Sequence, residues 1–476
     1  MTVEHEAIAS ALEKINDLTF RAKLGALASD CPACGASRMR VALRGICAPG
    51  DGNSCATCSG EQEELAATLL RFWELLGSPR QELEAVQPSP RLRASIQRLI
   101  RVVSKWGLHY PLIMPMTVKW EVTNRCNLRC QHCLVDAGKG MAQELSTAEA
   151  LGLIDACVSL GVHNLGVLGG EPLLRDDVFT VMEYAISKRL AVTLTTNAIA
   201  IDEAVASKIA ALGLRDIAVS VDGIGEVHDR FRGVRGAFDR AVQGINNLVR
   251  HRVPFAIFTV VSRHNLHQLG EIVDLAVALG AAKFAVNDLQ PSGRAQALRD
   301  MCLSQEEYDR LGQIMDEKRA EYRDRPIRLV WAGVGKNPAT PDTERGPLLM
   351  SKCGAGLTEL TVGADGTIRA CPFLPPTTEN IRQRSLEEIW FDSDQLELYR
   401  DRTLLKGRCG ICNLKYACSG CRARAEAFLG DPLGPDVRCR LDDAFSPDEI
   451  SVWKDGGSAQ ASPLSHHKGH EGHKGW

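Results

Sequence analysis

The sequence predicts an α/β fold made of repeated strand–helix units, with smaller cysteine-rich regions before and after them. Six apolar, β-rich runs are separated by amphipathic stretches long enough for a crossover helix each time, which is typical of a parallel sheet. Apolar residues make up 45% and charged residues 24% of the chain, near the averages for globular proteins, and all but two of the 17 cysteines gather in three groups. Six such units are compatible with an open doubly wound sheet and with an incomplete barrel.

Length, charge and hydropathy exclude several classes of protein. A chain of 476 residues suggests several domains, at roughly 150 residues per domain. The net charge of −3 gives no general attraction to nucleic acid or to an anionic membrane. Pro111, Pro115 and Lys119, or Arg263 and His264, interrupt the most apolar runs before they could span a bilayer. The N-terminus lacks a secretory signal pattern, so we expect a cytoplasmic protein. From the charge and the interrupted apolar runs we expect no nucleic-acid or membrane partner.

Shifts in composition divide the chain into five segments: residues 1–108, 109–310, 311–345, 346–445 and 446–476. The first is predicted to be a mostly helical extension. Its Gly-rich loop carries Cys31, Cys34, Cys47, Cys55 and Cys58. Cytosolic thiols are kept reduced, and the two Cys-x2-Cys pairs are compatible with a structural zinc or a further iron–sulfur cluster.

The second segment contains the six strand–helix units. The predicted strands are Thr117–Val122, Asn164–Leu168, Ala191–Thr195, Asp216–Val221, Phe255–Val261 and Lys283–Asn287. A helix is predicted over Ser146–Leu160, because Ser146 can cap it and Glu149 stands at the third helical position of a capping box.

A helix is predicted over Gln305–Arg323, across the boundary between the second and third segments, and a Pro-rich linker follows it. In the fourth segment, Leu357–Val362 and Thr367–Ala370 are predicted to pair as a β-hairpin. The final segment is rich in Gly, Ser, Lys and His, and we expect it to be disordered. Its histidines, to which we assign no function, are His466, His467, His470 and His473.

The strongest chemical signal is a group of three cysteines directly after the first predicted strand. Cys126, Cys130 and Cys133 lie within eight residues, and their thiolates can bind three irons of a [4Fe–4S] cluster while the fourth iron stays open to a substrate or cofactor. The alternative is a structural zinc site, which needs a fourth ligand, and only His132 is at hand.

This spacing resembles the signature of the radical S-adenosylmethionine (SAM) superfamily, with His132 where relatives carry an aromatic residue. A second motif strengthens the resemblance: Gly169, Gly170, Glu171 and Pro172 follow the second strand, where the family places a turn that binds the amino group of SAM. The resemblance implies a (βα)6 partial TIM barrel, a SAM-binding cluster, and reductive cleavage of SAM to a 5′-deoxyadenosyl radical.

Further polar residues follow the third and fourth strands. The resemblance implies contacts to SAM from Asn197, Ser220 and Asp222. For Ser220 and Asp222 the alternative is helix capping or turn formation. Residues 228–233 (HDRFRG) resemble the family's following loop, although such charges also suit a solvated surface.

The fourth segment resembles the SPASM domain, an auxiliary-cluster extension of some radical SAM enzymes. The resemblance implies two more [4Fe–4S] clusters: a distal one on Cys409, Cys412, Cys418 and Cys439, and a nearer one on Cys353, Cys371 and Cys421. Only two residues separate Cys418 from Cys421, where many members have three. Glu359 stands where some relatives place a fourth cysteine of the nearer site, so one iron there is open or loosely held by this carboxylate.

Residues 405–412, 418–425 and 430–436 are similar to those of enzymes of the alternative haem and haem d1 pathways, and mycofactocin-type maturases share much of this pattern. The resemblance implies an oxidoreductase that modifies a tetrapyrrole side chain, with a ribosomal peptide or protein as the alternative substrate. A low-potential flavodoxin or ferredoxin would supply electrons. A noncatalytic iron–sulfur electron carrier is the rival from another class, although such a carrier has no use for the GGEP turn.

Overall fold

The computed structural model describes residues 115–138, 143–331, 353–412, 415 and 418–439. The predicted N-terminal extension with its five cysteines and the histidine-rich tail therefore lie outside the described residues. The same holds for residues 332–352, which include the last part of the predicted linker.

A nine-stranded sheet organises the described chain, in the order β7-β6-β5-β4-β3-β2-β1-β8-β9. Its strands are β1 (Thr117–Glu121), β2 (Asn164–Leu168), β3 (Ala191–Thr196), β4 (Asp216–Ser220), β5 (Ala256–Val261), β6 (Lys283–Asp288), β7 (Arg328–Trp331), β8 (Glu359–Val362) and β9 (Ile368–Arg369). All neighbours pair in parallel except β8 and β9, which are antiparallel. The six predicted core strands and the predicted hairpin are confirmed.

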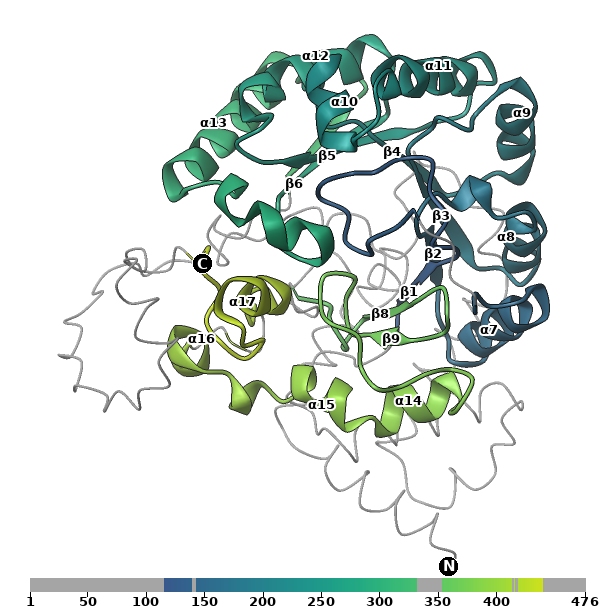
Figure 1. The fold of residues 1–476 in the computed structure, drawn as a ribbon, viewed down its shortest axis with the longest axis vertical. Helices are drawn as coiled ribbons and strands as arrows, with labels where there is room; N and C mark the ends of the chain where they lie inside the picture. Colours follow the sequence, from purple (N-terminus) through teal and green to yellow (C-terminus); the bar gives the residue numbers. More distant parts are fainter. Residues whose placement is uncertain (1–114, 139–142, 332–352, 413–414, 416–417, 440–476) are drawn as a thin grey trace, which may run out of the picture.

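Helices flank the curved sheet (Figure 1). The α-helices are α7 (Thr147–Ser159), α8 (Val178–Ser187), α9 (Glu203–Leu212), α10 (Glu226–Arg232), α11 (Ala237–Arg250), α12 (Leu269–Ala278), α13 (Gln305–Glu321), α14 (Leu386–Asp392), α15 (Asp394–Arg400), α16 (Gly407–Ile411) and α17 (Arg422–Leu429). The short 3-10 helices are η2 (Pro172–Leu174), η3 (Leu266–Gln268), η4 (Gly293–Met301) and η5 (Arg402–Leu404). Helices α7, α8, α9, α11, α12 and α13 form the outer rim of the arc of strands, and α14 to α17 lie on its open side.

Local capping determines where α7 begins. The Ser146 hydroxyl accepts from the Glu149 N–H at 3.3 Å, and a Glu149 carboxylate oxygen accepts from the Ser146 N–H at 2.8 Å. This reciprocal pair satisfies two helix N–H groups and confirms the predicted capping box. Helix α13 likewise confirms the helix predicted from Gln305.

Strand β7 was not predicted, because a four-residue run is too short to show a periodicity of its own. It pairs with β6, and the Trp331 ring packs against Tyr308 of α13 at 5.3 Å between centroids. The predicted linker over 311–345 therefore needs correction, since residues up to 331 include the second half of α13 and a core strand.

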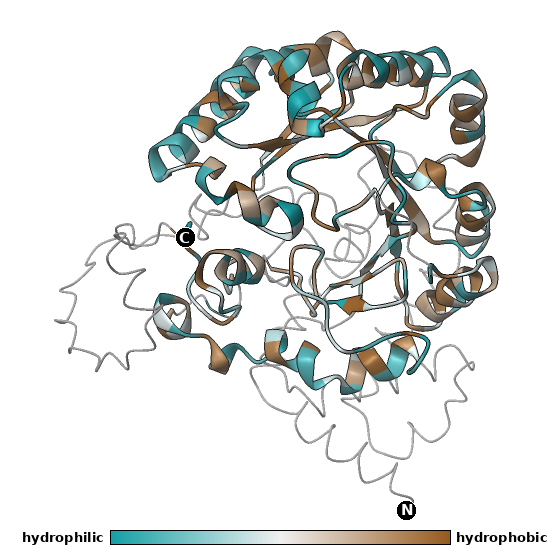
Figure 2. Ribbon diagram, viewed as in Figure 1, coloured by the Kyte–Doolittle hydropathy of each residue, from teal (hydrophilic) through white to brown (hydrophobic). Residues whose placement is uncertain are grey.

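One hydrophobic core runs through both the barrel and the region after residue 353. It includes Val118 and Trp120 of β1, Leu360 of β8 and Trp390 of α14. Figure 2 shows hydrophilic residues on the outward sides of the rim helices, so their apolar sides face the sheet. Because β8 pairs directly with β1, the region after residue 353 is built onto the edge of the barrel sheet. Within the described ranges, no helix is long and apolar enough to cross a membrane.

Candidate functional site

The three-cysteine loop leaves the C-terminal end of β1, and each of its sulfurs receives a nitrogen donor. The N–H of Leu128 points to Cys126 Sγ at 3.4 Å, and the N–H of Ala137 points to Cys133 Sγ at 3.3 Å. Arg232 donates to Cys130 Sγ at 3.7 Å. Such donors stabilise the negative charge of cluster thiolates, so the donor set fits an iron–sulfur cluster.

Burial of these thiols favours their neutral form as long as no metal is bound. It raises the pKa of Cys126 to about 11 and also raises the pKa of Cys130. Both thiols therefore ionise readily only when a cation such as iron compensates the charge. Among the described residues, no three metal-binding side chains surround a single point as one ion requires. A four-iron cluster takes its thiolates at separate corners instead.

The HDRFRG segment holds the loop from the other side. The Arg129 N–H donates to the Arg232 carbonyl at 3.0 Å, and the Gln131 N–H donates to the Phe231 carbonyl at 2.9 Å. Gly233 has a φ of 72°, and a Cβ there would lie 2.4 Å from the Arg129 carbonyl oxygen. His228, Phe231 and Arg232 are buried, so the solvated-surface interpretation of this segment is wrong.

The GGEP turn packs directly against the start of the cysteine loop. The Gly170 N–H donates to the Thr123 carbonyl at 2.7 Å, and the Glu171 N–H donates to the Arg125 carbonyl at 2.8 Å. Gly169 has a φ of 149°. Cβ atoms at Gly169 and Gly170 would lie only 2.6 and 2.2 Å from backbone oxygens of the loop. Glycine is therefore required for this close approach.

Glu171 and Asn197 join the turn to the end of β3. The buried Glu171 carboxylate accepts from Thr196 Oγ1 at 2.7 Å and from the Asn197 N–H at 2.8 Å. Burial raises the pKa of Glu171, whereas these donors act in the opposite direction. The Asn197 amide reaches back to Asn127 Oδ1, inside the cysteine loop, at 2.7 Å. Three motifs distant in sequence thus meet at one end of the sheet.

Ser220 and Asp222, at and just beyond the end of β4, are both buried. Asp222 forms an ion pair with Arg232 at 2.6 Å and accepts from the Val260 N–H at 2.8 Å. Although burial opposes ionisation, the Arg232 and His132 side chains hold the pKa of this carboxyl well below its usual range. The carboxylate therefore faces groups of the protein itself, and its predicted contact with SAM stays a prediction.

Replacing Gly170 by Ala tests the contact between the turn and the loop. The added methyl would meet backbone rather than a flexible side chain, so we expect a loss of about 1–3 kcal/mol in the free energy of unfolding and weaker iron binding at the loop. Gly152→Ala on α7 is the control, because its Cβ meets no atom within 4 Å and alanine favours the helix by about 1 kcal/mol. Thermal unfolding and iron content measure both effects, and equal stability of the two variants would contradict the contact.

The cysteines predicted for the nearer auxiliary site are brought together. Burial raises the pKa of Cys421 to about 12, and the neighbouring Cys353 contributes to this rise. Burial also raises the pKa of Cys371 well above its usual value, with the nearby Glu359 and Cys421 acting in the same direction. Glu359 accepts a hydrogen bond from Lys119 of β1 at 2.8 Å. The position of the missing fourth cysteine therefore carries an ion-paired carboxylate.

In the distal site, Cys409 is buried and receives a hydrogen bond from Arg422 at 3.6 Å. The short spacing between Cys418 and Cys421 is bridged by Ser419 and Gly420, both with left-handed backbones, at φ values of 56° and 65°. A Cβ on Gly420 would lie 3.2 Å from Cys409 Sγ. This turn thus brings its backbone close to the Cys409 thiol.

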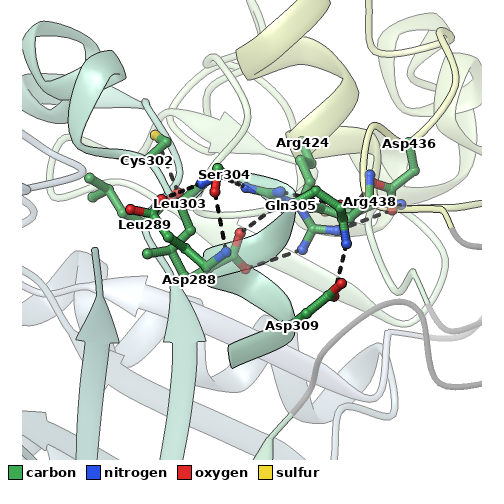
Figure 3. Close-up of polar contacts among 12 residues, drawn as sticks. Asp288, Leu289, Cys302, Leu303, Ser304, Gln305, Asp309, Arg424, Asp436 and Arg438 are labelled. Carbon is green, nitrogen blue, oxygen red and sulfur yellow. Dashed lines mark hydrogen bonds and ion pairs between the residues drawn. The ribbon is translucent and has the colours of Figure 1, made fainter. Parts of the chain in front are cut away.

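A buried network of four charges connects this region to the barrel (Figure 3). Asp288, at the end of β6, lies 3.4 Å from Arg424 of α17 and 3.9 Å from Arg438. Arg424 also pairs with Asp436 at 3.1 Å, and Asp436 accepts from the Cys421 N–H at 2.8 Å. Two cations and two anions thereby fix a predicted cluster cysteine against the core. No local pattern marks these partners in the sequence.

The two isolated cysteines have different surroundings from the clustered ones. Cys157 is fully buried on α7 within the hydrophobic core, and Cys302 is buried with its thiol directed to the Leu289 carbonyl. Neither contributes to the predicted sites, in agreement with the absence of a motif around them.

Comparisons with known proteins identify both parts. Residues 120–276 match the Radical SAM superfamily, and residues 353–422 match an iron–sulfur cluster-binding domain, SPASM. The AdoMet-dependent heme synthase of Methanosarcina barkeri is 35% identical over 337 residues, covering 68% of this chain and 96% of that protein. The Mycofactocin maturase MftC of Mycolicibacterium smegmatis is 32% identical over 367 residues, covering 75% of this chain and 88% of that protein.

Solved structures agree with the fold. SuiB of Streptococcus suis bound to S-adenosylmethionine superposes with a TM-score of 0.61 at 18% identity, covering 79% of this chain and 89% of SuiB. The predicted α/β class and partial barrel are confirmed, and the family implies [4Fe–4S] clusters and SAM binding. The chain is therefore an enzyme of the radical SAM superfamily that carries a SPASM iron–sulfur domain.

Proposed function

We propose that this enzyme oxidatively modifies a side chain of an iron tetrapyrrole, by removing carbon dioxide from a propionate. The observation that carries the proposal is the likeness to an AdoMet-dependent heme synthase over 96% of that protein, together with cysteine and GGEP motifs that meet at one end of the sheet. A second heme synthase, from Nitratidesulfovibrio vulgaris, is 32% identical and covered over 91% of its length.

The chemistry of the bound groups is one-electron reduction of SAM, which breaks its C5′–S bond and yields methionine and a radical that takes a hydrogen atom from the substrate. When the hydrogen leaves the carbon next to the ring, the remaining propionate fragment can release carbon dioxide and one electron and become a vinyl group. One electron enters and one leaves per turnover. The departing electron needs an acceptor, which the auxiliary clusters would provide.

The chain's own residues divide these tasks. Cys126, Cys130 and Cys133 would hold the core cluster, and the GGEP turn would orient the amino group of SAM. Asn197 and Ser220 would contact the remainder of SAM at the ends of β3 and β4, where ligands of βα folds bind. The SPASM cysteines would hold two auxiliary clusters, with Asp288 and Arg424 keeping them at a constant distance from the barrel. A flavodoxin or ferredoxin in the cytoplasm would supply the first electron.

A direct assay tests the substrate. Anaerobically reconstituted, full-length enzyme is incubated with SAM, a low-potential reductant and an iron coproporphyrin, and the products are analysed by mass spectrometry. We expect 5′-deoxyadenosine together with a porphyrin that has lost carbon dioxide and two hydrogens from a propionate. Formation of 5′-deoxyadenosine with unaltered porphyrin would refute the tetrapyrrole proposal while leaving SAM cleavage intact.

Peptide modification is the second candidate, favoured by the likeness to mycofactocin maturase over 75% of this chain. The substrate would then be a precursor peptide, and a short gene for it beside the gene of this enzyme would identify it. The same assay with such a peptide, and with the iron coproporphyrin as competitor, separates the two candidates, because only the true substrate will accelerate formation of 5′-deoxyadenosine.

A further inference from the structure

Arg232 connects a predicted cluster ligand to a fully buried carboxylate. This arginine ends α10 and is only 8% exposed. One of its terminal nitrogens lies 3.7 Å from Cys130 Sγ, and the other lies 2.6 Å from Asp222 Oδ2. A single guanidinium therefore touches both the thiol and its own counterion.

Asp222 is held firmly on the far side of this bridge. Its second carboxylate oxygen accepts from the Val260 N–H of β5 at 2.8 Å, and its carbonyl accepts from Asn265 Nδ2 at 2.8 Å. His132 Nε2 lies 3.2 Å from the same oxygen that pairs with Arg232, and the His132 ring stacks on Phe231 at 4.0 Å. The charge pair is thus anchored to β4 and β5, and contacts the cysteine loop at two points.

Charged side chains as close to a cluster ligand as Arg232 and Asp222 change the reduction potential of the cluster. Reduction adds one negative charge to an iron–sulfur cluster, so a neighbouring cation raises the reduction potential and a neighbouring anion lowers it. Salt screens buried charges only weakly. The cation here contacts the thiol directly, whereas the anion is one group further away. Their effects are therefore opposed and only partly cancel.

We propose that Arg232 and Asp222 form a matched charge pair that sets the reduction potential of the core cluster through Cys130. Arg232 is a positioning residue that stabilises the reduced state enough for the cluster to accept an electron. Asp222 limits this effect, so that the potential stays low enough to reduce SAM. The inference rests on the proposed function only in placing a cluster on Cys126, Cys130 and Cys133.

The distal site offers a matched comparison. Arg422 is also buried and donates to a predicted ligand, Cys409, at 3.6 Å. Its other hydrogen bonds in the described part of the chain go to the carbonyl oxygens of Pro432 and Gly434, at 2.9 and 2.8 Å. Removing this arginine changes the same kind of contact at a different cluster.

The test is a redox titration of the full-length, reconstituted protein, in which electron paramagnetic resonance follows the signal that changes when SAM is added. Arg232→Gln is expected to lower the midpoint potential of that signal, and Asp222→Asn to raise it and to slow SAM cleavage. The double variant should return towards the wild-type value. Arg422→Gln, the control, should leave this signal unchanged.

Opposite shifts are decisive because a merely structural role would change both single variants in the same direction. Unaltered potentials, or shifts of equal sign, at wild-type iron content would overturn the proposal. If Arg232→Gln binds too little iron to be measured, Arg232→Lys replaces it in the test. Lysine keeps the positive charge, so the midpoint potential of Arg232→Lys must lie closer to the wild-type value than that of Asp222→Asn. Absence of any SAM-responsive signal in the wild type would instead refute the proposed function, and with it this inference.

Discussion

Alanine at any one of Cys126, Cys130 and Cys133 is expected to reduce SAM cleavage to the level of cluster-free protein. Each thiolate would hold one iron of a cluster that already lacks a protein ligand at its fourth iron, so no spare ligand replaces the lost one. Formation of 5′-deoxyadenosine by the reduced protein measures the effect, alongside iron and sulfide content.

Cys157→Ala is the control for this first prediction. Its thiol is fully buried on α7, and burial alone raises its pKa to about 12. Removing a thiol from the core should leave cleavage at the wild-type rate at a small cost in stability. Full activity in any of the three loop variants would contradict the assignment of that cysteine as an iron ligand.

Removal of Cys409 or Cys412 should have the second largest effect, a loss of substrate turnover with SAM cleavage largely retained. The distal cluster would act after the radical has formed, because it belongs to the SPASM domain rather than to the loop at β1. We expect the iron content to fall by one cluster and the modified product to disappear, while 5′-deoxyadenosine still accumulates.

Cys302→Ala provides the matching control on this side of the molecule, since its thiol is buried in a small apolar cluster and its hydrogen bonds in the described residues go to the Leu289 and Leu298 carbonyl oxygens. It should keep both iron and product. Normal product formation by the Cys409 or Cys412 variants would remove the distal cluster from the reaction. An iron content in the wild-type protein sufficient for only one cluster would also contradict a role for the distal cluster.

Local sequence pattern was sufficient for the core strands and for the motifs that end them. Buried parallel strands appear as continuous β-rich runs, and the capping box of Ser146 and Glu149 predicts the helix between β1 and β2. The pattern failed for β7, whose four residues carry too little periodicity. For the HDRFRG segment it left two interpretations open, a loop of the site and a solvated surface, and the burial of Arg232 excludes the second.

The pairing of charged residues could not be predicted from local sequence pattern. Glu359 stands out in the sequence only as the replacement of a cysteine, and Lys119 only as an interruption of an apolar run. The structure pairs them because β8 adds to the sheet beside β1. That placement follows from the continuous core under both strands rather than from any preference of the two residues.

The sequence by itself determined which thiols and turns are predicted to carry the chemistry, because three cysteines within eight residues and a GGEP turn are local in the chain. Only the tertiary structure decided which charges accompany them. Arg232 lies 102 residues from Cys130, and Arg424 lies 136 residues from Asp288. Such partners meet through strand order and long-range packing, which local propensity does not encode. The groups expected to set the potential and spacing of the clusters are therefore visible only in the folded protein.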